Sequence, residues 1–159
     1  MRNLFFIISL LILLGSELSG QNNDNESFFT GTWHSTKKPF PYGADIEILP
    51  DHTFHFRVGA CTFRSFSEGS WKIIDSILIL DSYALDSCML ANYFGFECIP
   101  VDSFPEPVST IPGCIPEYSG MEYTIFDDEK FFFKDDTLRH IIRKKNTCPH
   151  VKNDYIKVE

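Results

Sequence analysis

The chain has 159 residues, long enough for one domain with an apolar core, and its formal net charge at pH 7 is −8. This acidic balance argues against nucleic acid and against an anionic membrane surface as partners.

Residues 1–20 have the pattern of a secretory signal peptide. Arg2 gives a positive start, the apolar run Leu4–Leu14 follows, and Gly15–Gly20 is small and polar. A helix of that apolar run would be about 16 Å long, whereas a bilayer core needs about 30 Å, so a membrane anchor is the weaker interpretation. No cysteine follows the run that could carry a lipid. We therefore expect a secreted or periplasmic protein without a membrane span.

The mature chain is predicted to begin with a disordered segment, residues 21–27, which is polar and rich in Asn. Residues 28–159 are expected to form a single β domain. No stretch shows a helical period, and apolar and polar residues alternate in short runs bounded by Pro, Asp, Ser and Gly. Eight strands are predicted, at Phe28–Ser35, Ala44–Leu49, His52–Val58, Gly69–Ile74, Ser76–Leu80, Met121–Phe126, Glu129–Lys134 and Thr137–Lys144.

These strands are expected to pair antiparallel, in up-and-down order, as an eight-stranded barrel or half-barrel. Pro50-Asp51, Asp75-Ser76, Asp127-Asp128 and Asp135-Asp136 are suited to the tight turns between them. Alternation gives each strand a buried and a wetted face, as a barrel or sandwich requires.

A long insertion, residues 82–119, interrupts the strand pattern. It contains three of the five cysteines and five of the nine prolines, which forbid regular central strands. Such a long connection in a compact domain is usually functional or disordered, and its cysteines and aromatic residues favour a stapled loop lying over the sheet.

The cysteines of an exported chain are disulfide candidates first. Spacing does not give the connectivity, although the clustering of three cysteines in the insertion suggests one bridge within it, and Cys148 could pair with Cys61. The odd count leaves at least one thiol free or paired with another molecule. The candidates are Cys61, Cys88, Cys98, Cys114 and Cys148.

Two copies of Gly-x-Trp, Gly31-Thr32-Trp33 and Gly69-Ser70-Trp71, each lead into alternating strands. With Pro50-Asp51 between them, this order resembles the small exported lipocalin-like (calycin-type) β-barrel domains of bacteria. In that family the first-strand Trp packs at the closed end of the barrel beneath a basic side chain from the last strand. The resemblance thus implies a structural role for Trp33, with Arg139 or Arg143 as its cationic partner.

No catalytic motif is present, so we expect a protein that is not an enzyme and has no cofactor. There is no Gly-x-Ser-x-Gly elbow, and the paired carboxylates lie in predicted turns. His52 and His55 are three residues apart, so on a strand they would face opposite sides and could not join His34 or His140 in a metal site.

The leading hypothesis is a non-enzymatic, lipocalin-like binding protein that holds a small hydrophobic ligand at the barrel mouth. The inward aromatic residues Phe54, Phe56, Trp71 and Tyr123 would line that pocket, or they simply fill the core. The alternative is a protein-interaction or inhibitor module that presents the disulfide-stapled loop 88–114. A third interpretation is a metal-responsive protein that uses the histidines and the unpaired thiol.

Overall fold

The computed structural model describes residues 23–36, 43–60, 63–95, 108–117, 119–142 and 153–158. Several predictions concern residues outside these ranges: the signal peptide 1–20, the basic side chain of Arg143, and the cysteines Cys61, Cys98 and Cys148.

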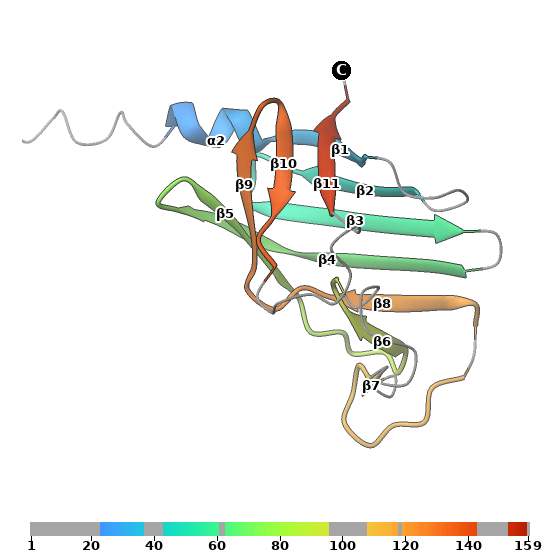
Figure 1. The fold of residues 1–159 in the computed structure, drawn as a ribbon. Coiled ribbons are helices and arrows are strands. Elements are labelled where there is room, and N and C mark those ends of the chain that lie inside the picture. Colours follow the sequence, from blue (N-terminus) through green and yellow to red (C-terminus); the bar gives the residue numbers. More distant parts are fainter. Residues whose placement is uncertain are drawn as a thin grey trace, which may run out of the picture.

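The described residues form one short helix and one large, mostly antiparallel sheet (Figure 1). In chain order the elements are α2 (Asn23–Phe29), β1 (Gly31–Ser35), β2 (Gly43–Ile48), β3 (Thr53–Ala60), β4 (Phe63–Ile74), β5 (Ile77–Ser82), β6 (Leu90–Tyr93), β7 (Val108–Ser109), β8 (Met121–Ile125), β9 (Glu129–Lys134), β10 (Thr137–His140) and β11 (Asp154–Lys157).

Eight of the strands close into a barrel, which confirms the predicted all-β, up-and-down architecture. Around the barrel the order is β1, β2, β3, β4, β5, β9, β10 and β11, and each neighbouring pair is antiparallel. The last strand, β11, pairs with β1 and completes the circle, with Trp33 opposite Lys157. A closed barrel leaves no unpaired edge strand among these eight.

Two of the predicted tight turns adopt the backbone that hairpins prefer. Asp75 and Ser76 both have positive φ, at 52° and 63°, and Asp135 and Asp136 have 52° and 55°. Positive φ at both central residues is the mark of a type I′ turn, whose twist matches that of the flanking strands. Asp tolerates this region better than most residues because its short side chain can bond locally.

Two strands differ from the prediction: one predicted barrel strand lies outside the barrel, and one barrel strand was not predicted. The segment Met121–Ile125 is a strand, as predicted, but it runs parallel to β4 and to β6 outside the barrel circle. The eighth barrel strand is β11, which the sequence analysis missed. It is four residues long and only Tyr155 is fully buried, so its hydrophobic pattern is weak.

One edge of β4, which has 12 residues, pairs with two different strands along its length. Its second half pairs with β5, while its first half, at Arg64–Phe66, pairs with β8 on the side that β5 has left. Figure 1 shows β8, β6 and β7 continuing the sheet below β4, away from β1. We call this part, which comprises the described residues between 83 and 128, the extension. Hydrophobic alternation predicts that a segment is a strand but not which neighbour it will pair with.

The structure corrects the prediction of a disordered segment up to Ser27. Residues Asn23–Phe29 form a helix, and Phe29 is buried in the barrel core. The indole Nε1–H of Trp33 donates to the Phe29 carbonyl at 2.7 Å, which fixes the end of the helix to β1. Such a short helix depends on tertiary packing rather than on propensity. No helix among the described residues is long and apolar enough to cross a membrane.

Inside the barrel, side chains from all eight strands and from the helix pack into one apolar cluster. Gly69 shows how closely these groups approach. A β-carbon placed on Gly69 would lie 2.0 Å from the Asp81 carbonyl oxygen and 2.5 Å from the Phe54 ring. Only glycine fits between β5 and the core here.

We therefore predict that Gly69→Ala lowers the free energy of unfolding by about 1–3 kcal/mol, as overpacking typically does. Gly59→Ala is the matched control, because its new β-carbon would meet only the Phe63 carbonyl, at an ordinary 3.8 Å. Urea unfolding of both variants measures the difference. Equal stabilities of the two would contradict this packing.

Candidate functional site

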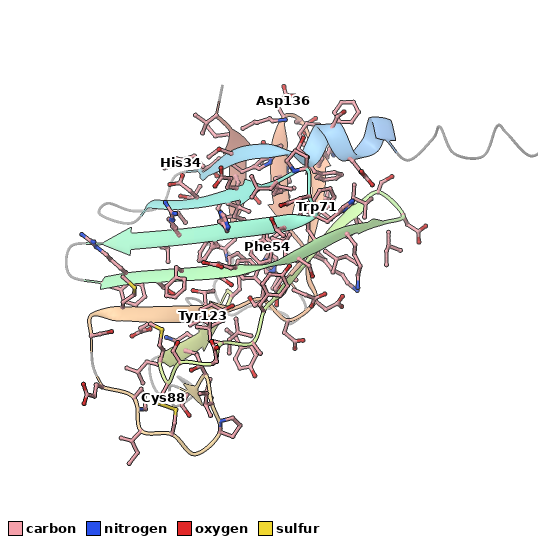
Figure 2. All side chains as sticks on the ribbon, turned by 180° about the vertical axis from the view of Figure 1, so that it is seen from behind. His34, Phe54, Trp71, Cys88, Tyr123 and Asp136 are labelled. Atoms are coloured by element: carbon pink, nitrogen blue, oxygen red, sulfur yellow. A yellow bond between two sulfur atoms is a disulfide. The ribbon has the colours of Figure 1, made fainter. Side chains whose placement is uncertain are left out.

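The four aromatic residues predicted to line a pocket are all buried, with exposed fractions of 3% or less. Phe54, Phe56 and Trp71 belong to the barrel core cluster, and Tyr123 does not. Figure 2 shows Phe54 and Trp71 within the barrel and Tyr123 below them, at the root of the extension. The structure therefore does not gather these residues around one space.

The polar atoms of Trp71 and Tyr123 are satisfied by backbone carbonyls. The Trp71 Nε1–H donates to Leu49 at 2.8 Å. The Tyr123 hydroxyl lies 2.7 Å from the carbonyl of Tyr83 and 3.1 Å from that of Glu68. Both side chains thus bond to the backbone of neighbouring segments. This favours the interpretation that they fill the core rather than line a pocket.

A basic side chain from the last strand does lie over Trp33, as the resemblance implies, but it is neither of the two expected arginines. Lys157 Nζ lies 5.6 Å from the centre of the indole ring. Arg139 instead donates to the Asp135 carboxylate at 3.3 Å. The reason is that β11, which carries Lys157, is the last strand of the barrel and pairs with β1.

A buried polar centre lies at the other end of the barrel, where the chain enters and leaves the extension. Glu129 and His140 lie two residues from the buried Phe131 and Leu138, so both point inward. His140 Nε2 and Glu129 Oε2 are 2.6 Å apart, and their side chains are only 6% and 11% exposed. Asn153, just before β11, is also buried.

Two atoms of this polar centre have no hydrogen-bond partner among the described residues. They are His140 Nδ1 and Asn153 Oδ1. Buried polar atoms of this kind normally have a partner, because leaving one unpaired costs about 1–3 kcal/mol. Among the described residues, these two atoms thus have hydrogen-bonding capacity that no other group uses.

Gly95, in the turn that follows β6, lies against the same two residues. Its φ is +78°, and a β-carbon there would lie 3.5 Å from His140 Cε1 and 3.7 Å from Asn153 Nδ2. These are ordinary van der Waals distances, so a methyl group on Gly95 would fit in contact with both side chains.

The neighbouring Phe94 side chain fills the apolar side of the polar centre. Its ring stacks on Phe126 at 4.3 Å and meets Phe56, Phe131 and His140 at 5.0–5.7 Å. Phe94 is held by a backbone bond from its N–H to Ile125. It is the one ring of this group that comes from the insertion.

The sequence contained a signal for this centre that the analysis did not use. Glu129 and His140 occupy inward positions of strands that were assigned correctly, in register with the apolar residues beside them. A charged residue on the inner face of a barrel strand is a candidate site, because burial without a partner is costly.

The extension carries the predicted disulfide. Cys88 and Cys114 are bonded, which confirms a bridge within the insertion and is compatible with an extracellular or periplasmic location. The short strands β6 and β7 pair beside it, with Leu90 opposite Ser109.

Within the described ranges no three His, Cys, Asp or Glu side chains are grouped so that they could hold a metal ion. His34 pairs with Asp45 at 2.6 Å and His55 with Glu47 at 3.4 Å, both on the exposed outer face.

Comparison with protein-family models, with curated proteins and with solved structures found no match. The fold is an antiparallel eight-stranded barrel and is compatible with a calycin-like architecture.

The two His–Glu pairs allow a matched test of the polar centre. Glu129→Ala should lower the free energy of unfolding by about 1–3 kcal/mol, because it leaves the buried His140 Nε2 without a partner. Glu47→Ala, at the exposed His55 pair, should change it by no more than about 0.5 kcal/mol. Urea unfolding would contradict the assignment if the two variants lost the same stability.

A second prediction concerns Glu122, which faces Asn92 across β8 and β6. Burial raises the pKa of the Glu122 carboxyl above its usual 4.5, and the hydrogen bond from the Asn92 amide partly offsets this. Since the folded state keeps this proton to higher pH than the unfolded state, the contribution of Glu122 to stability falls as pH rises from 4.5 through its folded pKa.

An NMR titration of the Glu122 side chain should therefore give a midpoint above 4.5, and Asn92→Ala should raise that midpoint further. A midpoint at or below 4.5, or one that falls in Asn92→Ala, would show that burial does not dominate.

Proposed function

We propose that the protein is a non-enzymatic, secreted or periplasmic binding module of lipocalin-like type, which holds a small ligand at the open end of its barrel. The observation that carries the proposal is a pair of buried polar atoms, His140 Nδ1 and Asn153 Oδ1 beside Gly95, which have no hydrogen-bond partner in the described part of the chain. Binding sites combine an apolar enclosure with a few polar groups that fix orientation, and this end of the barrel has both.

The chemistry of the two atoms indicates the ligand's polar group. When His140 donates its Nε2–H to Glu129, its Nδ1 is a hydrogen-bond acceptor, and Asn153 Oδ1 is an acceptor as well. The ligand then supplies a donor, such as an N–H or O–H. The Glu129 carboxylate bonds to the other ring nitrogen of His140. Because like charges repel, it favours a ligand head group without negative charge.

The apolar part of the ligand takes the place of the Phe94 ring. That ring contacts Phe126, Phe56 and Phe131, all of which would offer the same edges and faces to an aromatic or aliphatic ligand. Phe94 comes from the insertion rather than from a barrel strand, so it can leave without unpairing the barrel.

A second candidate function, recognition of another protein, is supported by a different observation: the disulfide-bonded extension exposes apolar side chains. It concerns exposed side chains of the extension and is compatible with ligand binding in the barrel.

The test uses N-phenyl-1-naphthylamine, an uncharged apolar dye with one N–H donor that fluoresces when it is enclosed. The wild-type protein should bind it, Phe94→Ala should bind it more tightly, and His140→Phe should bind it about tenfold more weakly because an acceptor is lost. Asn153→Leu provides a second variant if His140→Phe is poorly folded, and circular dichroism checks both.

The outer-face variant His34→Phe is the control and should leave dye binding unchanged. The proposal is overturned if neither the wild type nor Phe94→Ala binds the dye. It is also overturned if the two polar-centre variants bind it as well as the wild type does.

A further inference from the structure

His140, in the buried polar centre, is a group whose hydrogen-bonding character can reverse. A neutral imidazole has one N–H donor and one acceptor nitrogen, whereas an imidazolium has two N–H donors. Histidine is also the residue type whose charge ordinarily changes between about pH 5 and 8. The His140 side chain is only 6% exposed, and its Nδ1 is buried. A proton gained at Nδ1 therefore acts on whatever the site holds rather than on bulk water.

Geometry decides which ring nitrogen gains that proton. His140 Nε2 lies 2.6 Å from Glu129 Oε2, and two such atoms approach so closely only with a proton between them. The one N–H of the neutral ring is therefore held at Nε2. An added proton goes to Nδ1, which has no hydrogen-bond partner among the described residues. Solvent loses one proton, Nδ1 gains one N–H bond, and the pair of side chains loses its negative charge.

Glu129, from β9, is the charged side chain that faces the His140 ring at hydrogen-bond distance. Other charged residues of β9, β10 and β11 near this end occupy outward positions, because side chains alternate along a strand: Lys130, Lys134, Arg139 and Asp154. The buried side chains that pack here from β11, from the residue before it and from the turn after β6 are uncharged: Tyr155, Asn153 and Phe94. Glu129 is therefore the charge that balances an imidazolium at this position.

We infer that acid reverses the selectivity of the site. A ligand whose N–H or O–H bonds to neutral His140 is released when Nδ1 gains its proton, and a ligand with an acceptor, such as a carbonyl group, is bound instead. Two donors that face each other cannot bond, and both then stay buried without a partner. A carbonyl oxygen, by contrast, accepts from Nδ1–H. This inference rests on the proposed function, because it concerns the same polar centre.

A second histidine–carboxylate pair, on the outer face, shows what burial contributes. His34 Nδ1 and Asp45 Oδ1 are also 2.6 Å apart, but their side chains are 51% and 52% exposed. Water can donate to or accept from the second ring nitrogen of His34 in either protonation state, so its titration leaves no group unpaired. The same contact is thus a solvated pair outside the barrel and a pH-dependent site inside it.

The test compares two uncharged probes of nearly the same shape. N-phenyl-1-naphthylamine has an N–H donor, and phenyl 1-naphthyl ketone has a carbonyl acceptor in its place. Equilibrium dialysis measures both at about pH 8 and about pH 5, in whichever of the wild type and Phe94→Ala binds the amine more tightly. On acidification the affinity for the amine should fall at least tenfold and that for the ketone should rise about threefold or more. Circular dichroism checks that the fold is the same at both pH values.

Two variants assign the effect to His140. His140→Gln keeps a polar amide but cannot gain a proton in this range, so each probe should bind it equally well at both pH values. His34→Gln removes the exposed pair and should keep the full pH dependence. Nitrogen NMR of the imidazole rings in the ligand-free wild type gives a further measurement that needs no variant. His140 Nδ1 should carry no proton at about pH 8 and one proton at about pH 5.

The outcomes separate this inference from the proposed function. If the amine binds equally well at both pH values, the reversal is wrong and the proposed function stands. If the amine binds to neither protein at either pH, the proposed function fails and this inference fails with it. A proton on Nδ1 already at the higher pH, or none at the lower, overturns the reversal whatever the probes do. A tenfold loss that persists in His140→Gln also overturns it.

Discussion

The closed barrel, and with it the enclosure of the core, depends on the pairing of the last strand with the first. In β11, Tyr155 lies opposite Ser35 and Lys157 opposite Trp33, and these pairs close the barrel. Closure buries Tyr155 and Trp33 completely. Asn153, just before β11, is tied to the polar centre through the neighbouring strand β10, because its carbonyl accepts the His140 backbone N–H at 3.3 Å.

The second constraint is the junction along β4, where β8 takes the place of β5 as the neighbouring strand. Hydroxyl groups bond across this junction: Ser67 to Ser82 at 2.7 Å and Ser65 to Thr124 at 2.6 Å. Small hydroxyl residues fit here because three strands approach closely and their polar atoms can pair with each other rather than remain buried alone. The junction lets the extension leave the barrel without opening it. Tyr93 and Phe94 then point to different parts of the molecule, the first exposed and the second packed among the barrel rings.

Most of the fold could be predicted from the sequence, because alternation and turn residues act locally. Ile46 and Ile48 in β2, and the turns Asp75-Ser76 and Asp135-Asp136, lie as expected. The partners of two strands, β8 and β11, could not be predicted. Nothing in residues 121–125 marks them as parallel to β4, and the four residues of β11 have too little pattern to be found. The helix was missed because it depends on one buried side chain, Phe29.

The site was predicted less well, for a physical reason. Inward aromatic residues were expected to line a pocket, but aromatic rings pack against each other whenever they can, as Phe54 and Phe126 do at 5.1 Å. The more informative residues are the polar ones on inward positions, Glu129 and His140. Both were visible in the sequence.

The most direct test of the account is an NMR search for contacts between β1 and β11. Closure predicts nuclear Overhauser effects between backbone protons of His34 and Ile156, which lie opposite each other in the antiparallel pair. It also predicts slow solvent exchange of the hydrogen-bonded amides in both strands. If these contacts are absent and the amides of β1 exchange freely, the barrel is open between β1 and β11 and the closed fold described above is contradicted.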